Sequence, residues 1–298
     1  MTEIAAPLAL PRRHQLHWPL LGLWNKAGAL HKLYLVLLGL VLLAALFGPV
    51  LAPFDPDAQK LLARLKPPVG FEGALSQHLL GTDQLGRDLL SRMLHGLRLT
   101  LLIALAGGVI SLVLGVAAGV VAGYARGPVG AGLMAHVDLQ LAVPFTLIAL
   151  LAIALFGNSL PILILIVGLS GWEAYARVVR GQVLSVARMP FVEAAVAAGA
   201  SHRRILFRHV LPNVASPVIV VWTMNFSSLI LLESSLSFLG LGVQPPTATL
   251  GSMVGLGRDY LASSAWIALI PSLLILFVSL LVLLIGDWLR DALDVRLK

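Results

Sequence analysis

Apolar residues along this chain gather in long runs that are separated by short polar stretches. A helix needs roughly 17–25 mostly apolar residues to cross a hydrocarbon core about 30 Å thick. Six runs are long enough, namely residues 33–51, 99–122, 137–156, 160–176, 214–241 and 265–289. The pattern therefore predicts an all-α integral membrane protein with six transmembrane helices.

Two of these runs are less regular than the others. Asp138 and Pro144 interrupt the third run, and only the segment 157–159 separates it from the fourth. A chain with five spans is therefore the main alternative. The first run exceeds the roughly 7–15 apolar residues of a secretory signal peptide, so we expect it to be an uncleaved span.

The positions of lysine and arginine predict how the spans are oriented, because cytoplasmic loops carry an excess of both. Basic residues occur in the N-terminal tail, after the second run, between the fourth and fifth runs, and at the C-terminal end. They are Arg12, Arg13, Lys26, Lys32, Arg126, Arg177, Arg180, Arg188, Arg203, Arg204, Arg208, Arg290, Arg296 and Lys298. With six spans these regions share one side, so we expect both termini in the cytoplasm.

This topology divides the chain into three parts. Residues 1–32 are expected to form a cytoplasmic tail, and residues 33–98 a first transmembrane helix with a proline-containing external loop. Residues 99–298 are expected to form a five-helix core with a cytoplasmic loop at about 187–212.

The composition supports a membrane location. Hydrophobic residues make up 58% of the chain and charged residues 12%, whereas soluble domains carry about 25% charged residues. The net charge of +7 arises from residues that lie between apolar runs. Topology explains this charge better than a nucleic-acid surface does, so we expect contact with the lipid bilayer and no nucleic-acid partner.

The motifs of common catalytic sites are missing from the sequence. No lysine follows a glycine, so the P-loop that would hold the phosphates of ATP is absent. Neither His-Glu-x-x-His nor Gly-x-Ser-x-Gly occurs, the histidines are scattered, and there is no cysteine. We therefore expect no catalytic residue, no metal site and no cofactor in this chain.

Gly115, Gly119 and Gly123 are spaced four residues apart in the second run, so they share one face of a helix. Small residues at such a face let two transmembrane helices approach closely. Helix packing is the preferred interpretation, and a glycine-lined translocation path is the alternative.

Two acidic residues fall within the apolar runs. Glu233 lies in the fifth run, where a charge must be neutralised, paired, or turned towards a water-filled cavity. A residue of the path or gate and a hydrogen-bonded structural group are both open for Glu233. Asp138 is expected near the cytoplasmic end of its span, in a structural role.

The basic loop between the fourth and fifth runs has a helical pattern. Residues 191–198 are rich in alanine, and Gly199 can take the left-handed conformation that ends a helix. Ser201 can cap a second helix that runs towards Pro212. Such a segment is suited to docking on another protein, and an amphipathic segment on the membrane surface is the alternative.

At this point the sequence resembles a known family. Glu193, Ala194, Ala195, Gly199, Leu211 and Pro212 match the Glu-Ala-Ala loop of ABC importer permeases, with one departure at His209. The stretches 80–88, 237–242 with Pro245 and Pro246, and 286–293 resemble its dipeptide/oligopeptide/nickel branch. The first stretch supplies an outer-face motif of Gly81, Thr82, Asp83, Gly86, Arg87 and Asp88. The resemblance covers residues 33–298 and is to the second permease subunit of that branch.

The resemblance implies the type I importer permease fold and an assembly in the bacterial inner membrane. A second, homologous permease subunit would form a heterodimer with this chain, and two ATP-binding subunits would bind ATP and Mg²⁺. An extracytoplasmic solute-binding protein would deliver the substrate. The first half of the Glu-Ala-Ala loop would be the coupling helix, with Glu193 to Gly199 in contact with the ATPase and electrostatic support from Arg203, Arg204 and Arg208. The outer-face motif would form a short helix that supports the second span.

The resemblance implies import of dipeptides or oligopeptides, with nickel, a metal chelate or glutathione as alternatives. A second class of function is a proton-coupled secondary transporter that uses Glu233 as its proton carrier. An integral-membrane enzyme is a third class, but it needs a polar cluster that the sequence lacks.

Overall fold

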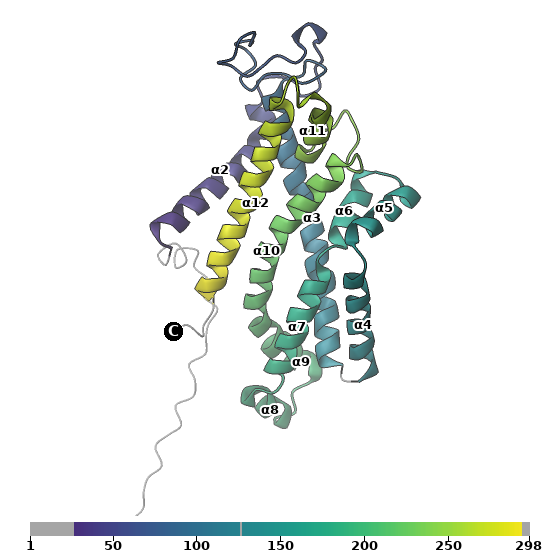
Figure 1. Ribbon diagram of the computed structural model, residues 1–298. Helices are drawn as coiled ribbons and strands as arrows, with labels where there is room; N and C mark the ends of the chain where they lie inside the picture. Colours follow the sequence, from purple (N-terminus) through teal and green to yellow (C-terminus); the bar gives the residue numbers. More distant parts are fainter. Residues whose placement is uncertain (1–26, 126, 294–298) are drawn as a thin grey trace, which may run out of the picture.

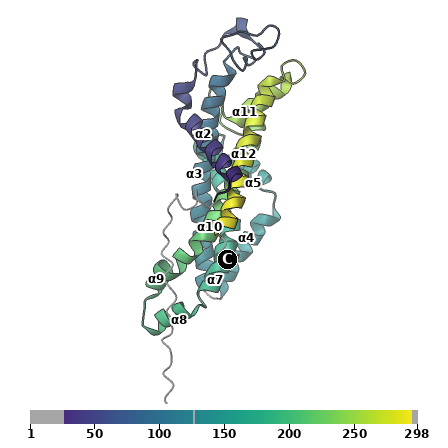
Figure 2. The same cartoon turned by 90° about the vertical axis from the view of Figure 1, so that its left-hand side faces the viewer.

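The computed structural model describes residues 27–125 and 127–293. Long helices lie side by side along one axis, and a compact loop region crowns one end (Figures 1 and 2). The helices of the described residues are α2 (Ala29–Leu51), α3 (Leu89–Tyr124), α4 (Pro128–Ala142), α5 (Phe145–Phe156), α6 (Leu160–Gly168), α7 (Trp172–Val186), α8 (Pro190–Ala197), α9 (His202–Ile205), α10 (Leu211–Phe238), α11 (Leu250–Gly257) and α12 (Trp266–Leu293). Short helical turns cover Leu61–Ala63, Leu206–Val210 and Arg258–Tyr260.

The number of candidate spans agrees with the prediction. Five helical segments are long and apolar enough to cross a membrane, and the count rises to six if the bent pair α4 and α5 forms one span. An all-helical membrane protein with five or six spans is therefore confirmed.

The third span is not the straight helix that we expected over residues 137–156. Its chain starts nine residues earlier, at Pro128, and α4 and α5 meet at an angle of 89°. The break falls at Val143 and Pro144. A proline has no N–H for the helix and disfavours the helical conformation of the residue before it, which explains the bend.

The fourth span is also longer than expected, because α6 and α7 together extend to Val186. The two helices meet at Gly171, which has a φ of +79°. The break frees carbonyl groups, and the Ser111 hydroxyl of α3 donates hydrogen bonds to the carbonyl oxygens of Gly168 and Ser170. These bonds satisfy backbone groups that lipid could not.

Close packing of α3 on α7 confirms the packing interpretation of the glycine face. A Cβ on Gly115 would lie 2.3 Å from the carbonyl oxygen of Trp172, and one on Gly119 2.6 Å from that of Ala176. A Cβ on Gly123 would lie 2.8 Å from the Cβ of Val183. The two backbones are therefore closer than any larger residue would allow. Atoms of α7 occupy the space beside the three glycines, so these glycines do not line a path.

Two of the predicted cytoplasmic segments lie on the same side of the molecule. The last turn of α12 and the α8–α9 segment lie away from the 52–88 loop and α11, which form the opposite end (Figure 1). Arg188 and Arg290 belong to these segments, and Lys32 lies in the first turn of α2. The predicted tail and its Arg12, Arg13 and Lys26, together with Arg126, Arg296 and Lys298, fall outside the described residues.

We predict that Gly119→Ala lowers the stability of the protein, because the added methyl group meets the backbone of α7. Overpacking of this kind costs about 1–3 kcal/mol. Gly39→Ala is the matched control, since a Cβ there meets nothing within 4 Å and the gain in helix propensity is the same. Thermal unfolding of the detergent-purified variants measures the difference. Equal midpoints for the two variants would contradict the prediction.

Candidate coupling site

The segment between α7 and α10 forms an elbow that projects from the side of the molecule opposite the 52–88 loop (Figure 1). Pro190 opens α8 in its first turn, where a missing N–H costs nothing. The Gly199 N–H donates to the carbonyl of Val196 and the Ala200 N–H to that of Ala195. With a φ of +76° at Gly199, this is a Schellman motif, and the predicted left-handed helix end is confirmed.

The second half of the elbow begins as predicted but does not stop at Pro212. The Ser201 hydroxyl accepts a hydrogen bond from the Arg204 N–H at 3.4 Å, so Ser201 caps α9. The chain then passes through a π-helical turn, Leu206–Val210, directly into α10. The Leu211 N–H bonds to the carbonyl of Leu206, and the wider turn places Pro212 where its ring is tolerated.

Valine and isoleucine side chains of the elbow pack against α3, α7 and α10. Val192, Ile205 and Val210 are buried in one cluster with valines of α3, α7 and α10. The Tyr124 hydroxyl lies 2.7 Å from Nδ1 of His202, which joins the end of α3 to α9. Sequence reasoning missed this contact, since the two residues are 78 positions apart.

The opposite surface of the elbow is open and partly apolar. Glu193, Ala194, Gly199, Arg203 and Arg204 are exposed, and Ala195, Leu211 and Pro212 are half-buried. Three large apolar side chains also face outwards, with exposed fractions of 41% for Phe191, 57% for Val196 and 67% for Phe207. All the elbow residues singled out by the sequence therefore lie on one projecting unit.

The outer-face motif is a tight loop, not the short helix that we expected. Gly81 and Gly86 have φ values of +80° and +73°, and a Cβ on either would collide with the backbone of Lys66 or Lys60. Thr82 and Asp88 pair in an isolated antiparallel bridge. Asp88 then caps α3 by accepting the Ser91 N–H at 2.8 Å. Positive φ angles cannot continue a right-handed helix, which explains the difference.

Buried ion pairs hold this loop against the start of α3. Asp83 accepts a hydrogen bond from Nε of Arg87 at 2.6 Å, and both side chains are 4% exposed. Nε of Arg92 lies 3.5 Å from the same carboxylate, and Nδ1 of His78 lies 2.8 Å from Asp88. The motif therefore stabilises the outer end of the second span, which was its expected position.

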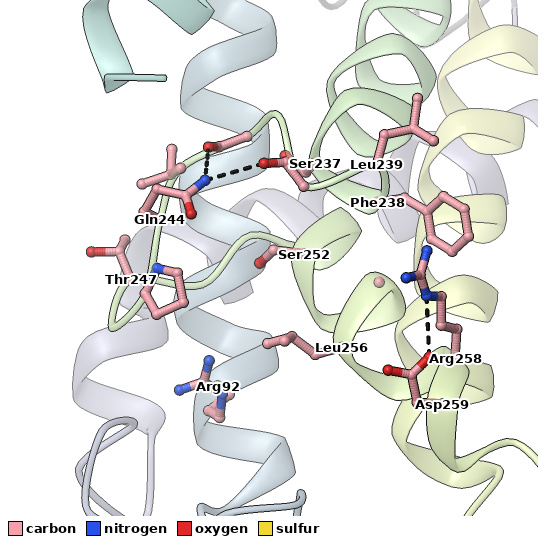
Figure 3. Close-up of a pocket in the computed structure, with 15 residues that line it drawn as sticks. Arg92, Ser237, Phe238, Leu239, Gln244, Thr247, Ser252, Leu256, Arg258 and Asp259 are labelled. Atoms are coloured by element: carbon pink, nitrogen blue, oxygen red, sulfur yellow. Dashed lines mark hydrogen bonds and ion pairs between the residues drawn. The ribbon is translucent and has the colours of Figure 1, made fainter. Parts of the chain in front are cut away.

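A pocket of about 290 Å³ lies between α3 and the 239–249 loop that follows α10. Figure 3 shows Gln244 and Thr247 from the loop, Ser252 from α11, and Arg92 from α3 around it. Gln244 donates hydrogen bonds to the carbonyls of Gly240 and Gly242, which shape the loop. The 237–242 stretch singled out in the sequence thus forms part of this wall.

Glu233 is fully buried at the junction of α3, α10 and α11. Its carboxylate accepts hydrogen bonds from Ser237 at 2.7 Å and Ser234 at 3.4 Å. The hydroxyls of Thr100 and Thr249 also interact with it. Four hydroxyl groups that the sequence alone did not identify therefore surround Glu233. This is the environment expected for a hydrogen-bonded structural group. A role of Glu233 in the path or gate stays a prediction.

Asp138 lies beside Arg177 of α7, with 2.6 Å between Oδ1 and Nη2. Since α4 starts at Pro128, Asp138 sits more than two helical turns from the end of its helix, deeper than we expected. The ion pair with Arg177 supports the structural role that the sequence predicted.

Comparison with known proteins decides the family. Residues 115–298 match the family described as "Binding-protein-dependent transport system inner membrane component". Residues 34–68 match the "N-terminal TM domain of oligopeptide transport permease C". The chain belongs to this permease family.

The similarity extends over nearly the whole permease. The chain is 43% identical to the di/tripeptide transport system permease protein DppC of Pseudomonas aeruginosa, over 94% of this chain and 93% of the relative. It is 35% identical to the dipeptide transport system permease protein DppC of Haemophilus influenzae, over 94% of this chain and 96% of the relative. It is also 36% identical to the glutathione transport system permease protein GsiD of Pectobacterium atrosepticum, over 87% of this chain and 84% of the relative.

A solved structure has the same fold. An inward-facing form of the MetNI methionine ABC transporter superimposes with a TM-score of 0.57 and 20% identity, over 69% of this chain and 96% of that chain. The permease is thus a multi-pass inner-membrane protein of an ABC importer. Such a permease is a non-catalytic subunit that works with a separate ATPase and a binding protein.

We predict that Asp83→Ala destabilises the permease strongly, because it leaves Arg87 buried without its partner. Breaking a buried pair costs about 3–5 kcal/mol. The control is Asp259→Ala, whose partner Arg258 is 57% exposed and whose loss should cost about 0–1 kcal/mol. Thermal unfolding in detergent compares the two variants. A loss at Asp83 no larger than that at Asp259 would refute the stabilising role of the loop.

Proposed function

We propose that the permease forms half of the translocation path of an ATP-driven importer of dipeptides and oligopeptides. A second, homologous permease subunit would form the other half as a heterodimer. Two ATP-binding subunits would bind ATP and Mg²⁺ on the cytoplasmic side, and an extracytoplasmic binding protein would deliver the peptide. The names of the relatives support the substrate class, since several are di-, tri- or oligopeptide permeases.

The elbow is proposed as the coupling element that docks on an ATPase subunit. Small residues such as Ala194 and Gly199 let α8 enter a groove, and the exposed Phe191, Val196 and Phe207 supply apolar contact area. Arg203 and Arg204 add positive charge at the rim of this surface. The combination of exposed apolar side chains on a segment whose base is rigidly anchored is the observation that carries the proposal.

The contacts of the elbow offer a route from the ATPase to the spans. The π-helical turn and α10 continue from α9 without a loop, so a displacement of α8 would move α10 as well. The bond between Tyr124 and His202 would pass the same displacement to α3. Both helices reach the outer end of the molecule, where the pocket beside Arg92 lies. Closure of the ATPases would in this way change access to the path.

We predict that Ala194→Trp uncouples the assembly, because an indole on the exposed face of α8 blocks entry into a groove. Substrate-stimulated ATP hydrolysis by the reconstituted complex should fall to the level of the ATPase subunits alone. This variant is sharper than Gly199→Trp, which also strains a left-handed backbone. Ala58→Trp, in the exposed outer loop, is the control. Full stimulation by Ala194→Trp would refute the coupling assignment.

The proton-coupled alternative depends on Glu233 and can be separated from the proposal. In the Glu233→Gln variant, the side-chain amide can still accept a hydrogen bond from the Ser237 hydroxyl but cannot carry a proton. We predict that Glu233→Gln keeps most of the ATP-dependent peptide uptake in proteoliposomes that hold the whole assembly. Abolished uptake with unchanged ATP hydrolysis, or uptake without any ATPase, would favour the proton-coupled mechanism instead.

The substrate is the part of the proposal that rests on the relatives alone. Nickel, a metal chelate and glutathione remain the alternative cargoes, and the external binding protein would select among them. Mass spectrometry of the ligand that copurifies with the partner binding protein identifies the class directly. A metal chelate or glutathione there, with no peptide, would replace the peptide assignment and leave the coupling mechanism intact.

A further inference from the structure

A hollow of about 280 Å³ lies between α4 and α7. Met134 and Asp138 of α4 line it, together with Arg177, Arg180, Gly181 and Leu184 of α7. The α7 residues follow Arg177 at intervals of three, four and seven positions, so they form one face of that helix. A single water needs roughly 10–15 Å³ in the same measure, so the hollow has room for more than one water.

The charges around the hollow do not balance. Arg177 is paired with Asp138 at 2.6 Å. Arg180 has no acidic partner within the described residues, and its buried Nε has no hydrogen-bond acceptor there. A buried donor without an acceptor is costly, and more so when it is charged. Two arginines and one aspartate therefore line the hollow, which leaves one positive charge uncompensated.

The depth of Arg180 in the membrane follows from its contact with α3. Its carbonyl oxygen lies 3.2 Å from the position that a Cβ on Gly123 would take. Gly123 directly follows the apolar run 99–122. Arg180 thus lies level with the end of the apolar run of α3, where the cytoplasmic headgroups are expected, and Arg177 with Asp138 lies about one helical turn further in. The apolar side chains of Met134 and Leu184 line the same hollow.

We propose that this hollow binds an anionic phospholipid of the cytoplasmic leaflet, with its phosphate beside the guanidinium group of Arg180. Arg177 lies beside the phosphate, and Asp138 weakens binding by competing for Arg177. Basic pockets between transmembrane helices on the cytoplasmic side are typical sites for such headgroups. A lipid here would bridge α4 and α7 next to the elbow. This site is independent of the transported substrate.

The experiment uses the assembled transporter, reconstituted in vesicles with equal amounts of phosphatidylglycerol and phosphatidylcholine and then analysed by native mass spectrometry. The unaltered complex should retain phosphatidylglycerol in preference to phosphatidylcholine. Arg180→Gln should retain about fivefold less, the loss that one arginine near the membrane surface typically carries. Arg290→Gln, an exposed arginine that does not line the hollow, is the control and should lose clearly less than Arg180→Gln.

A variant of opposite sign separates loss of the site from damage to the fold. Asp138→Asn frees Arg177 and should increase the retention of phosphatidylglycerol. The proposal is overturned if Arg180→Gln retains as much as the unaltered complex, or if Arg290→Gln loses as much. It is also overturned if Asp138→Asn loses the lipid. Absence of any preference in the unaltered complex, with Arg180→Gln separating the two permease subunits, would overturn it too and assign the hollow to the partner subunit.

Discussion

The contact between α3 and α7 is the interaction on which the rest of the molecule depends. Lipid provides no hydrophobic drive between helices, so their association rests on close packing. Gly115, Gly119 and Gly123 allow the two backbones to touch over the cytoplasmic half of α3. One partner, α7, leads directly into the elbow, and the other ends at Tyr124, which bonds to His202 in α9. The position of the elbow relative to the spans is therefore set by this packing.

The outer end of α3 is held in a different way, because it lies before the apolar run that begins at residue 99. Asp88 caps the helix, and the pairs between Asp83 and two arginines fold the preceding loop over its start. Ion pairs and tight turns thus fix the start of α3, and close packing against α7 fixes its end. The helix α3 therefore connects the proposed coupling elbow with the pocket beside Arg92 (Figure 3).

Breaks in the other spans show how the fold satisfies backbone groups inside the membrane. The bend at Pro144 and the turn at Gly171 both interrupt helical hydrogen bonding. The single hydroxyl of Ser111 is shared between the freed carbonyls of Gly168 and Ser170, and the π-helical turn before Leu211 accommodates Pro212. The irregular backbone at Gly171 and before Pro212 lies against neighbouring helices, where such geometry is tolerated. At Gly171 the chain therefore changes direction while freed carbonyls stay hydrogen-bonded.

Local sequence by itself determined the features that need no distant partner. Run length predicted the spans, the basic residues predicted the sidedness, and Gly199 and Ser201 predicted the two ends inside the elbow, because each effect acts within a few residues. The Glu-Ala-Ala pattern led to the family. Only the tertiary structure decided the 89° bend at Pro144, the continuation of the chain past Pro212, and the loop form of the outer-face motif. It also supplied the hydroxyl groups around Glu233 and the unbalanced Arg180, since these depend on which residues of other helices come within a few ångströms.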